Sequence, residues 1–422
     1  MSVDGSVVAV ISGGYEGKRP IHVRMAELGA RLVILDEAGH WSQSLAQEGI
    51  AAAFLPVAVT GDPDDDAAAI LAALAQAGIA PDGILTFWEF SVGVAARVAT
   101  SLGLPTNPVE AVDAARSKVR TRELSTQLGL PTPKARRVRS LDELFAASAY
   151  VGFPAVVKPE FGAGAVGCLR VDTPESLPDV YSLARQEVGS GHDFMFRAGN
   201  DLLVEEYLDG VEFDVDLVMH EGRCLFSSVS QNWPTAEPSF QETGLHCPPD
   251  HDRKAVARLV DLAVTTAHAF GLDRGVLHIE GKCTSHGPRV VEVNARMGGG
   301  RIHEYVRAVW DVDLVEAQLR NCLGLPPNAR PSRKPRCAVV DRLIYAPSSG
   351  RLAALPFDNQ PRTSGPTVIV DIHAEIGEDV RGPDAVFATE LAEVTVVAAD
   401  LRTARSIMAQ VLREPPLIRP LP

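Results

Sequence analysis

Two glutamates, Glu280 and Glu292, lie at equal distances from His286 in a segment with the composition of a strand, a turn and a second strand. Branched residues dominate both flanks, and turn-forming residues lie between them. A hairpin closed symmetrically would place the two carboxylates opposite each other, roughly 5 Å apart, where like charges are destabilising. The pattern therefore predicts a cation between them.

Asn294 follows Glu292 by two residues, so it shares the same face of the strand. An oxygen-only ligand set favours Mg²⁺ or Mn²⁺ over Zn²⁺. Magnesium held by one or two carboxylates usually accompanies bound phosphate. The alternative interpretation is an exposed hairpin whose glutamates are solvated.

A lysine precedes a glycine-rich segment: Lys158 is followed by Gly162, Gly164 and Gly167. These glycines match G-x-G-x-x-G, but a dinucleotide fingerprint needs a helix directly after them, and residues 168–171 have strand composition. A strand, glycine loop and strand can instead fold over a triphosphate and offer backbone N–H groups, with the lysine supplying charge. A glycine-rich hairpin without a ligand is the alternative.

Residues 202–218 have the composition of a strand, a tight turn and a strand with acidic side chains at the turn. As a hinge, this segment would meet a purine edge and ribose hydroxyls; as a surface hairpin, it would meet only solvent. The groups concerned are Glu205, Glu206, Tyr207, Leu208 and Glu212.

Lys118, within a helix expected over about 111–128, precedes these features in the chain, and Arg296 follows them. In this order and spacing, residues 1–325 resemble the ATP-grasp superfamily of carboxylate-amine ligases. The resemblance implies that Lys118 and Lys158 contact ATP phosphates and that the glycine loop covers them. It further implies adenine contacts from Glu205, Glu206, Tyr207 and Leu208, a ribose contact from Glu212, and two Mg²⁺ ions on Glu280, Glu292 and Asn294. Arg296 would stabilise the acyl phosphate and the tetrahedral intermediate.

Segments 212–218, 241–244 and 292–299 are more closely similar to carnosine synthases and bacterial L-amino-acid ligases. This likeness implies substrate contacts near His246, Gly299, Gly300 and Arg301, in addition to Arg296. Gly300, Arg301 and His303 depart from relatives where the substrate pocket varies, so the identity of the substrates does not carry over.

The resemblance implies ATP-dependent amide-bond formation between two amino acids, or an amino acid and a related amine, with release of ADP and phosphate. His246 is a candidate for orienting a carboxylate or moving a proton, and a surface position is its alternative. Glu89 follows the strand expected at 83–87, where parallel sheets present ligand-binding groups, and is a candidate for binding a substrate ammonium. Competing hypotheses are another ATP-grasp ligase or carboxylase, a nucleotide-binding sensor, and an NAD-dependent oxidoreductase.

The elements that must position these residues fall into three units. Residues 1–112 alternate strand and helix, which predicts a parallel, Rossmann-like α/β domain. Its first loop, Gly13–Gly17, with Asp36 beyond it, partly matches a dinucleotide fingerprint, and a turn without a ligand is the alternative. We expect an ATP-grasp domain at 113–327, with a lid subdomain at about 135–202, and a C-terminal α+β domain at 328–422.

The formal charge of −14 over 422 residues, without a long basic run, argues against a nucleic-acid partner. Six scattered cysteines fit neither a zinc site nor a disulfide framework. No apolar stretch approaches the roughly 18 residues of a membrane span, and the N-terminus lacks the pattern of a signal peptide. We therefore expect a cytoplasmic protein that binds small molecules, and symmetry favours a homodimer.

Overall fold

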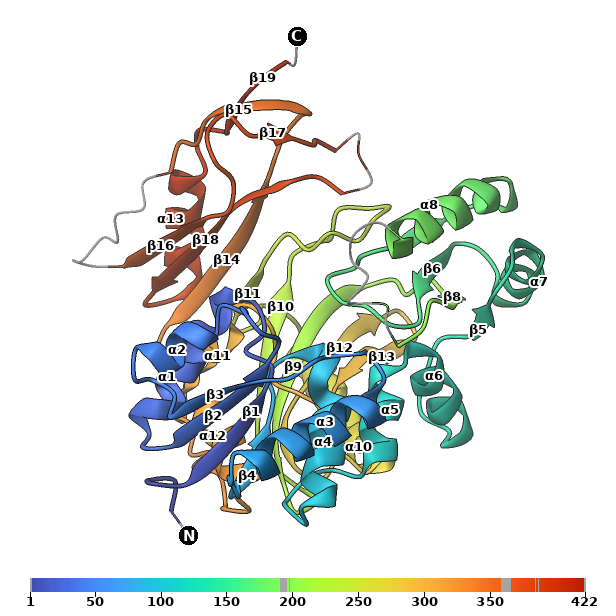
Figure 1. Cartoon of the computed structure of the whole chain (residues 1–422). Coiled ribbons are helices and arrows are strands. Elements are labelled where there is room, and N and C mark those ends of the chain that lie inside the picture. Colours follow the sequence, from blue (N-terminus) through green and yellow to red (C-terminus); the bar gives the residue numbers. More distant parts are fainter. Residues whose placement is uncertain are drawn as a thin grey trace.

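The computed structural model describes residues 2–189, 196, 198–357, 366–383, 385 and 387–420. Part of the expected lid, residues 190–195 and 197, lies outside this description. The chain forms an N-terminal α/β unit, a long central sheet and a smaller sheet beside it, with C-terminal strands above (Figure 1). The α/β fold class expected from the sequence is confirmed.

The N-terminal unit is a parallel four-stranded sheet in the order β3-β2-β1-β4. Its strands are β1 (Val7–Ile11), β2 (Arg31–Asp36), β3 (Ala53–Pro56) and β4 (Gly83–Leu85). Its helices are α1 (Arg19–Glu27), α2 (Gln43–Gln47), α3 (Pro63–Gln76) and α4 (Val92–Ser101). Helices α3 and α4 bury one face of the sheet. The other face packs on α1 and on α12 (Leu314–Cys322), which returns from much later in the chain.

The first loop of this unit is closed by its own residues. The Asp36 carboxylate accepts hydrogen bonds from the Gly13 N–H at 2.7 Å and the Ser12 hydroxyl at 3.2 Å, and it lies 3.0 Å from His40 Nδ1. A carboxylate so engaged is not available to a ribose. The partial dinucleotide fingerprint is therefore a tight turn.

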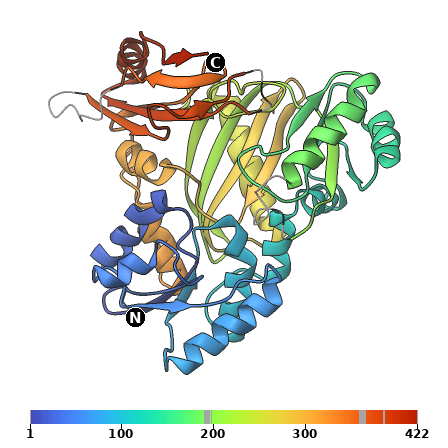
Figure 2. The same cartoon turned by 45° about the horizontal axis from the view of Figure 1, so that its top comes forward.

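The central sheet has eight strands in the order β13-β12-β9-β10-β11-β14-β18-β16. Figure 1 labels these strands, and Figure 2 shows the sheet from a second direction. Its first five strands in that order are β13 (Gly287–Asn294), β12 (Gly275–Thr284), β9 (Val211–His220), β10 (Arg223–Asn232) and β11 (Leu245–Cys247). Helix α10 (Arg253–Phe270) is amphipathic and buries Leu259 and Phe270 in the core beneath these strands. This packing holds the strands in place, and the opposite face of the sheet carries the charged residues of the cavity.

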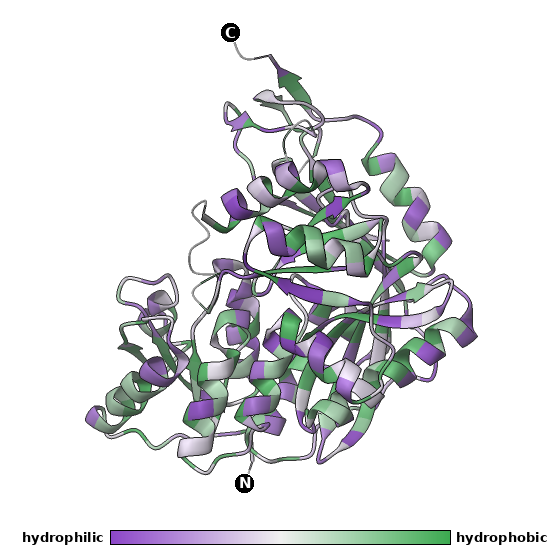
Figure 3. Cartoon of the chain, turned by 90° about the vertical axis from the view of Figure 1, so that its right-hand side faces the viewer, coloured by the Kyte–Doolittle hydropathy of each residue, from purple (hydrophilic) through white to green (hydrophobic). Residues whose placement is uncertain are grey.

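The C-terminal strands β14 (Ala338–Tyr345), β16 (Thr367–Ile372) and β18 (Glu390–Ala398) extend this same sheet, because β14 pairs with β11. Helix α13 (Leu401–Val411) covers them, with Ala404 and Met408 buried against the sheet. A small sheet of β17 (Asp379–Val380), β15 (Gly350–Ala354) and β19 (Leu417–Arg419) lies beyond. Apolar and polar residues alternate along the surface helices (Figure 3). None of the helices within the described ranges is long and apolar enough to span a membrane.

The smaller sheet has the strand order β5-β8-β6-β7 and lies in the range expected for the lid subdomain, so we call it the lid. Its elements are β5 (Ala135–Val138), α7 (Leu141–Val151), β6 (Ala155–Pro159), β7 (Leu169–Val171), α8 (Leu177–Gly189) and β8 (Leu202–Glu206). Strand β8 belongs to this sheet and β9 to the central sheet, so residues 207–210 connect two sheets rather than close a hairpin. This arrangement agrees with the hinge interpretation of the segment.

The single helix expected over 111–128 is two helices, α5 (Val109–Arg116) and α6 (Lys118–Gln127). Ser117 between them is extended, with φ −89° and ψ 112°, and its side chain accepts a hydrogen bond from the Arg120 N–H as an N-cap. The Ser117 hydroxyl also donates to Glu160 of the lid at 2.5 Å. The break therefore makes Lys118 the first residue of α6 and turns it toward the lid.

Gly210, in the connection between the two sheets, offers a test of how tightly that connection is packed. Its φ is +88°, and a Cβ there would lie 2.1 Å from the Cys283 carbonyl oxygen. We expect Gly210→Ala to lower the free energy of unfolding by about 2 kcal/mol, measured by urea denaturation. Gly129→Ala is the control, because Gly129 has φ +68° and open space at the Cβ position. Equal effects of the two variants would contradict the close packing.

Candidate active site

A cavity of about 1030 Å³ lies where the N-terminal unit, the lid and both ends of the central sheet meet. Most of the residues singled out from the sequence line it, although they come from distant parts of the chain. They are Glu89, Lys118, Lys158, Gly162, Gly164, Glu205, Glu206, Tyr207, Leu208, Glu212, Glu280, Glu292, Arg296, Gly299, Gly300 and Arg301. Gly167, Asn294 and His246 are not among its lining residues.

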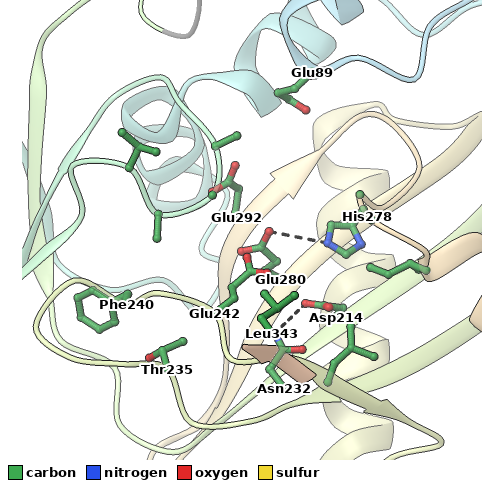
Figure 4. A pocket seen from close by; sticks show the side chains of 18 of the residues that line it. Glu89, Asp214, Asn232, Thr235, Phe240, Glu242, His278, Glu280, Glu292 and Leu343 are labelled. Carbon is green, nitrogen blue, oxygen red and sulfur yellow. Dashed lines mark hydrogen bonds and ion pairs between the residues drawn. The ribbon is translucent and has the colours of Figure 1, made fainter. Parts of the chain in front are cut away.

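The two glutamates of the β12–β13 hairpin are direct cross-strand partners, Glu280 opposite Glu292. The register near the turn pairs Gly281 with Val290, so Val291 is an extra residue that forms a β-bulge. A one-residue change of register moves side chains to the other face. The bulge therefore aligns Glu280 with Glu292, and Figure 4 shows their carboxylates close together in the pocket.

The two carboxylates differ in their electrostatic surroundings. Burial and the neighbouring Glu292 hold the pKa of Glu280 well above its usual value. Burial also raises the pKa of Glu292, but Lys118 and Lys158 lower it further than burial raises it. The Lys118 Nζ lies 3.2 Å from Glu292 Oε2. Glu280 thus lacks sufficient positive charge nearby, and a cation beside it would favour its ionised form.

Asn294, the third oxygen donor predicted to hold a metal ion, is not among the residues that line the cavity. It is only 2% exposed, and its Oδ1 accepts from Arg296 Nη2 at 3.3 Å. Its Nδ2 is buried and has no hydrogen-bond partner within the described part of the chain. Two carboxylates and an amide oxygen are ligands of the kind that Mg²⁺ accepts.

A second charged row, which the sequence reasoning missed, runs beside the glutamates. In the register of β9 and β12, Asp214 lies opposite Glu280 and Asp216 opposite His278. His278 Nδ1 is 3.0 Å from Asp216, and its Nε2 is 3.8 Å from Glu280. Burial lowers the pKa of His278, but Asp216 raises it to about 10 overall. Period-two spacing of Asp214 and Asp216, and of His278 and Glu280, was the available sequence signal.

The two predicted phosphate-binding lysines approach the cavity from different elements. Lys118 donates a hydrogen bond to the Gly162 carbonyl at 3.4 Å, which links α6 to the glycine loop. Lys158 on β6 forms a buried ion pair with Glu205. Gly162 and Gly164, with φ of +137° and +63°, line the cavity. A Cβ on Gly167 would lie 2.9 Å from Pro159, so that glycine permits packing of the loop instead.

Glu205, which was predicted to contact adenine, lines the cavity and is held between two cations. Its carboxylate is paired with both Lys158 and Arg122, the latter at 2.8 Å. Burial raises the pKa of Glu205, but these two cations lower it to about 2. Each oxygen of the carboxylate contacts one cation, and the pair with Glu205 holds the Lys158 ammonium at the cavity wall. Arg122 was not predicted.

The rest of the hinge lines the cavity at the junction of lid and central sheet. Lys282, another residue missed from the sequence, donates to the Leu208 carbonyl and pairs with Glu212, both at 3.4 Å. The Tyr207 hydroxyl donates to Glu237 at 2.8 Å. The side chain of Glu206 accepts weakly from the Lys134 N–H at 3.3 Å.

Arg296 and Glu89 meet across the cavity wall, with Nε and Oε2 2.7 Å apart. This ion pair joins the central sheet to the loop after β4, where parallel sheets present ligand-binding residues. Glu89 therefore lies in the cavity as expected, but its charge is already matched by Arg296. Arg301 is similarly compensated, at 2.7 Å from Asp371 and 2.6 Å from Glu304.

His246 is not placed where a catalytic or substrate-binding role would require. It is fully buried on β11, and Nδ1 lies 3.1 Å from the Pro248 carbonyl while Nε2 lies 3.2 Å from Arg405 Nη2. Since the carbonyl requires a donor and the guanidinium an acceptor, the ring is neutral with its proton on Nδ1. Both nitrogens are used within the fold, so His246 packs α13 against β11.

Comparison with known proteins identifies two regions of this fold. Residues 25–106 match the ATP-grasp N-terminal domain, and residues 151–304 match the ATP-grasp domain. The L-amino acid ligase from Bacillus licheniformis has the same fold, with a TM-score of 0.81, 19% identity and 99% of each chain covered.

Relatives by sequence include ligases that join amino acids. Carnosine synthase 1 of Gallus gallus is 35% identical over 83% of this chain, and the L-arginine-specific L-amino acid ligase of Bacillus subtilis is 27% identical over 47% of this chain and 48% of its own length. The chain spans 38–41% of the length of the carnosine synthases that it matches. With both ATP-grasp regions matched and the complete fold shared, the chain belongs to the ATP-grasp superfamily.

Proposed function

We propose that the protein is an ATP-dependent ligase that joins the carboxylate of one amino acid to the amine of a second amino acid or a related amine. Its products would be an amide, ADP and phosphate. The observation that carries this proposal is the facing pair of Glu280 and Glu292, with Lys118 beside it, in the cavity that Lys158 and Arg296 also line. The activities named for carnosine synthase and the L-amino acid ligases support the same reaction class.

Positioning and electrostatics supply most of the catalysis in phosphoryl transfer. Lys118 and Lys158 would bind the ATP phosphates, and the loop containing Gly162 and Gly164 would offer backbone N–H groups. Glu280, Glu292 and Asn294 would hold Mg²⁺, which neutralises charge on the transferring phosphoryl group. The hinge at Glu206–Leu208 would bind adenine, and Glu212 would bind ribose.

The first carboxylate would attack the γ-phosphate and form an acyl phosphate. The amine of the second substrate would then attack the acyl carbon, and phosphate would leave. Arg296 would stabilise the negative charge that develops on the acyl oxygen, because it lines the cavity and its five N–H donors exceed its three contacts to Glu89, Met297 and Asn294. Closure of the lid would exclude water, which hydrolyses acyl phosphates.

The proposal predicts ADP release from ATP only when a suitable pair of substrates is present. Pairs of the common amino acids can be screened for ADP formation, and the products identified by mass spectrometry. Hydroxylamine should trap the acyl phosphate as a hydroxamate when the first amino acid is supplied alone. Formation of AMP and pyrophosphate would contradict the mechanism.

A further inference from the structure

Lys18 is a cavity-lining cation that the sequence reasoning did not single out. It ends the short 3-10 helix η1 (Glu16–Lys18), between the carboxyl end of β1 and the start of α1. The carboxyl ends of parallel strands are where α/β sheets bind ligands. The side chain lines the cavity, yet the residue is only 5% exposed. A buried ammonium at such a position needs an explanation.

The charge of Lys18 has no carboxylate partner among the described residues. Its Nζ lies 5.3 Å from the centre of the Tyr15 ring, and none of the acids in the described ranges forms an ion pair with it. Every other described lysine or arginine of the cavity wall is paired with an acid. Those residues are Arg19 with Glu48, Lys118 with Glu292, Lys158 with Glu205, Lys282 with Glu212, Arg296 with Glu89, and Arg301 with Asp371 and Glu304.

The surroundings of Lys18 make this unpaired charge costly. Burial lowers the pKa of Lys18, and Arg296 lowers it further, to about 8. Glu89 acts in the opposite direction but is already in contact with Arg296. A desolvated ammonium beside a second cation is unfavourable unless an anion joins them. The site is therefore suited to an anionic group of a ligand.

The backbone holds the Lys18 side chain in place. Gly14 has φ +66°, and a Cβ there would lie 2.7 Å from Lys18 Cδ, so the glycine leaves room for the lysine stem. The Gly14 carbonyl accepts a hydrogen bond from Trp41 Nε1 at 2.5 Å, which fixes the loop. A cation held in this way loses little conformational freedom when a ligand binds.

We infer that Lys18 binds the carboxylate of the amine-donating amino acid and thereby sets specificity for that substrate. This inference rests on the proposed function. In that reaction the amine donor keeps one carboxylate that does not react, and this group requires a cation of its own. Lys118 and Lys158 belong to the phosphate side of the cavity, where they contact Glu292 and Glu205. Lys18 belongs to the N-terminal unit and can bind the carboxylate of the amine-donating amino acid.

The test compares each amine donor found by the ADP screen with its own carboxamide, which keeps the amine and loses the negative charge. The wild-type protein should prefer the acid. In Lys18→Met, KM for the acid should rise roughly ten- to a hundredfold, while kcat/KM for the carboxamide stays unchanged. Lys18→Arg should keep part of the preference, and Lys254→Met, the same change at an exposed position of α10, should keep all of it.

Hydroxamate formation separates this role from a role in the first step. Hydroxylamine has no carboxylate, so Lys18→Met should form hydroxamate at the wild-type rate, which also shows that the variant is folded. Equal loss of hydroxamate and amide formation would overturn the inference, because Lys18 would then act on the acyl phosphate or its phosphate. An unchanged preference for the acid in Lys18→Met, or a wild-type preference for carboxamides, would overturn it too. Absence of hydroxamate in the wild type would instead refute the proposed function.

Discussion

Glu280→Gln is expected to reduce amide formation by roughly a thousandfold, about 4 kcal/mol, while the metal-free protein becomes no less stable. The glutamine keeps the size of the side chain but removes a charged metal ligand. Because burial and Glu292 favour the neutral form of Glu280, an uncharged amide relieves an unfavourable interaction in the absence of Mg²⁺. ADP release measures the first effect, and thermal unfolding in the presence of a chelator measures the second.

The control is Glu123→Gln, which makes the same substitution on the exposed side of α6. It should change neither turnover nor Tm appreciably. Mg²⁺ should raise the Tm of the wild type, since a ligand that binds only the folded state stabilises it, and should raise that of Glu280→Gln less. A marked fall in the Tm of the metal-free Glu280→Gln protein would show that the carboxylate supports the fold rather than the reaction.

The pairing of Glu280 with Glu292 could be predicted from the sequence, but for an incomplete reason. Symmetry about His286 assumes an unbroken register, whereas the turn pairs Thr284 with Gly287 and the bulge at Val291 restores the alignment. A bulge depends on contacts outside the hairpin, such as the hydrogen bond from Arg122 to the Val291 carbonyl at 2.6 Å. Contacts of that range leave no local sequence signal.

Local signatures identified Lys158, before its glycine loop, and Arg296, after Asn294, and both residues line the cavity. The roles of others depend on partners far away in the sequence. Glu205 forms an ion pair with Arg122 from α6, and His246 forms a hydrogen bond with Arg405 from the C-terminal helix α13. Composition and periodicity describe one element at a time, so they could not show that these side chains are already paired.

The fold shows the same division between local and distant information. Alternation of strands and helices identified the N-terminal α/β unit, and its core is largely local. The addition of α12 to that unit, and the pairing of β11 with β14 that continues the central sheet, join segments distant in the chain. Strands β14, β16 and β18 thus share a sheet with β9–β13, and β14 and β18 bring Asp341, Glu390 and Glu393 to the cavity wall.

Arg122 joins the two halves of the site, and its removal is expected to be the most destabilising of the changes considered. Its Nε contacts Glu205 at 2.8 Å, and its Nη2 donates to the bulged Val291 at 2.6 Å. The Arg122 and Glu205 side chains are only 4% and 5% exposed. Arg122→Met would leave a buried carboxylate with one partner fewer, at a cost of about 3–5 kcal/mol in the free energy of unfolding.

Urea denaturation should therefore separate Arg122→Met from Arg120→Met, because Arg120 is exposed on the same helix and its loss should change stability by less than about 0.5 kcal/mol. Adding Glu205→Gln to Arg122→Met should cost less than the sum of the two single changes, since the unpaired carboxylate is then absent. Additive costs would contradict the coupling. Turnover should also fall in Arg122→Met at temperatures where the protein stays folded. The guanidinium contacts Val291, whose bulge aligns Glu292, and it contacts Glu205, which holds Lys158 in place.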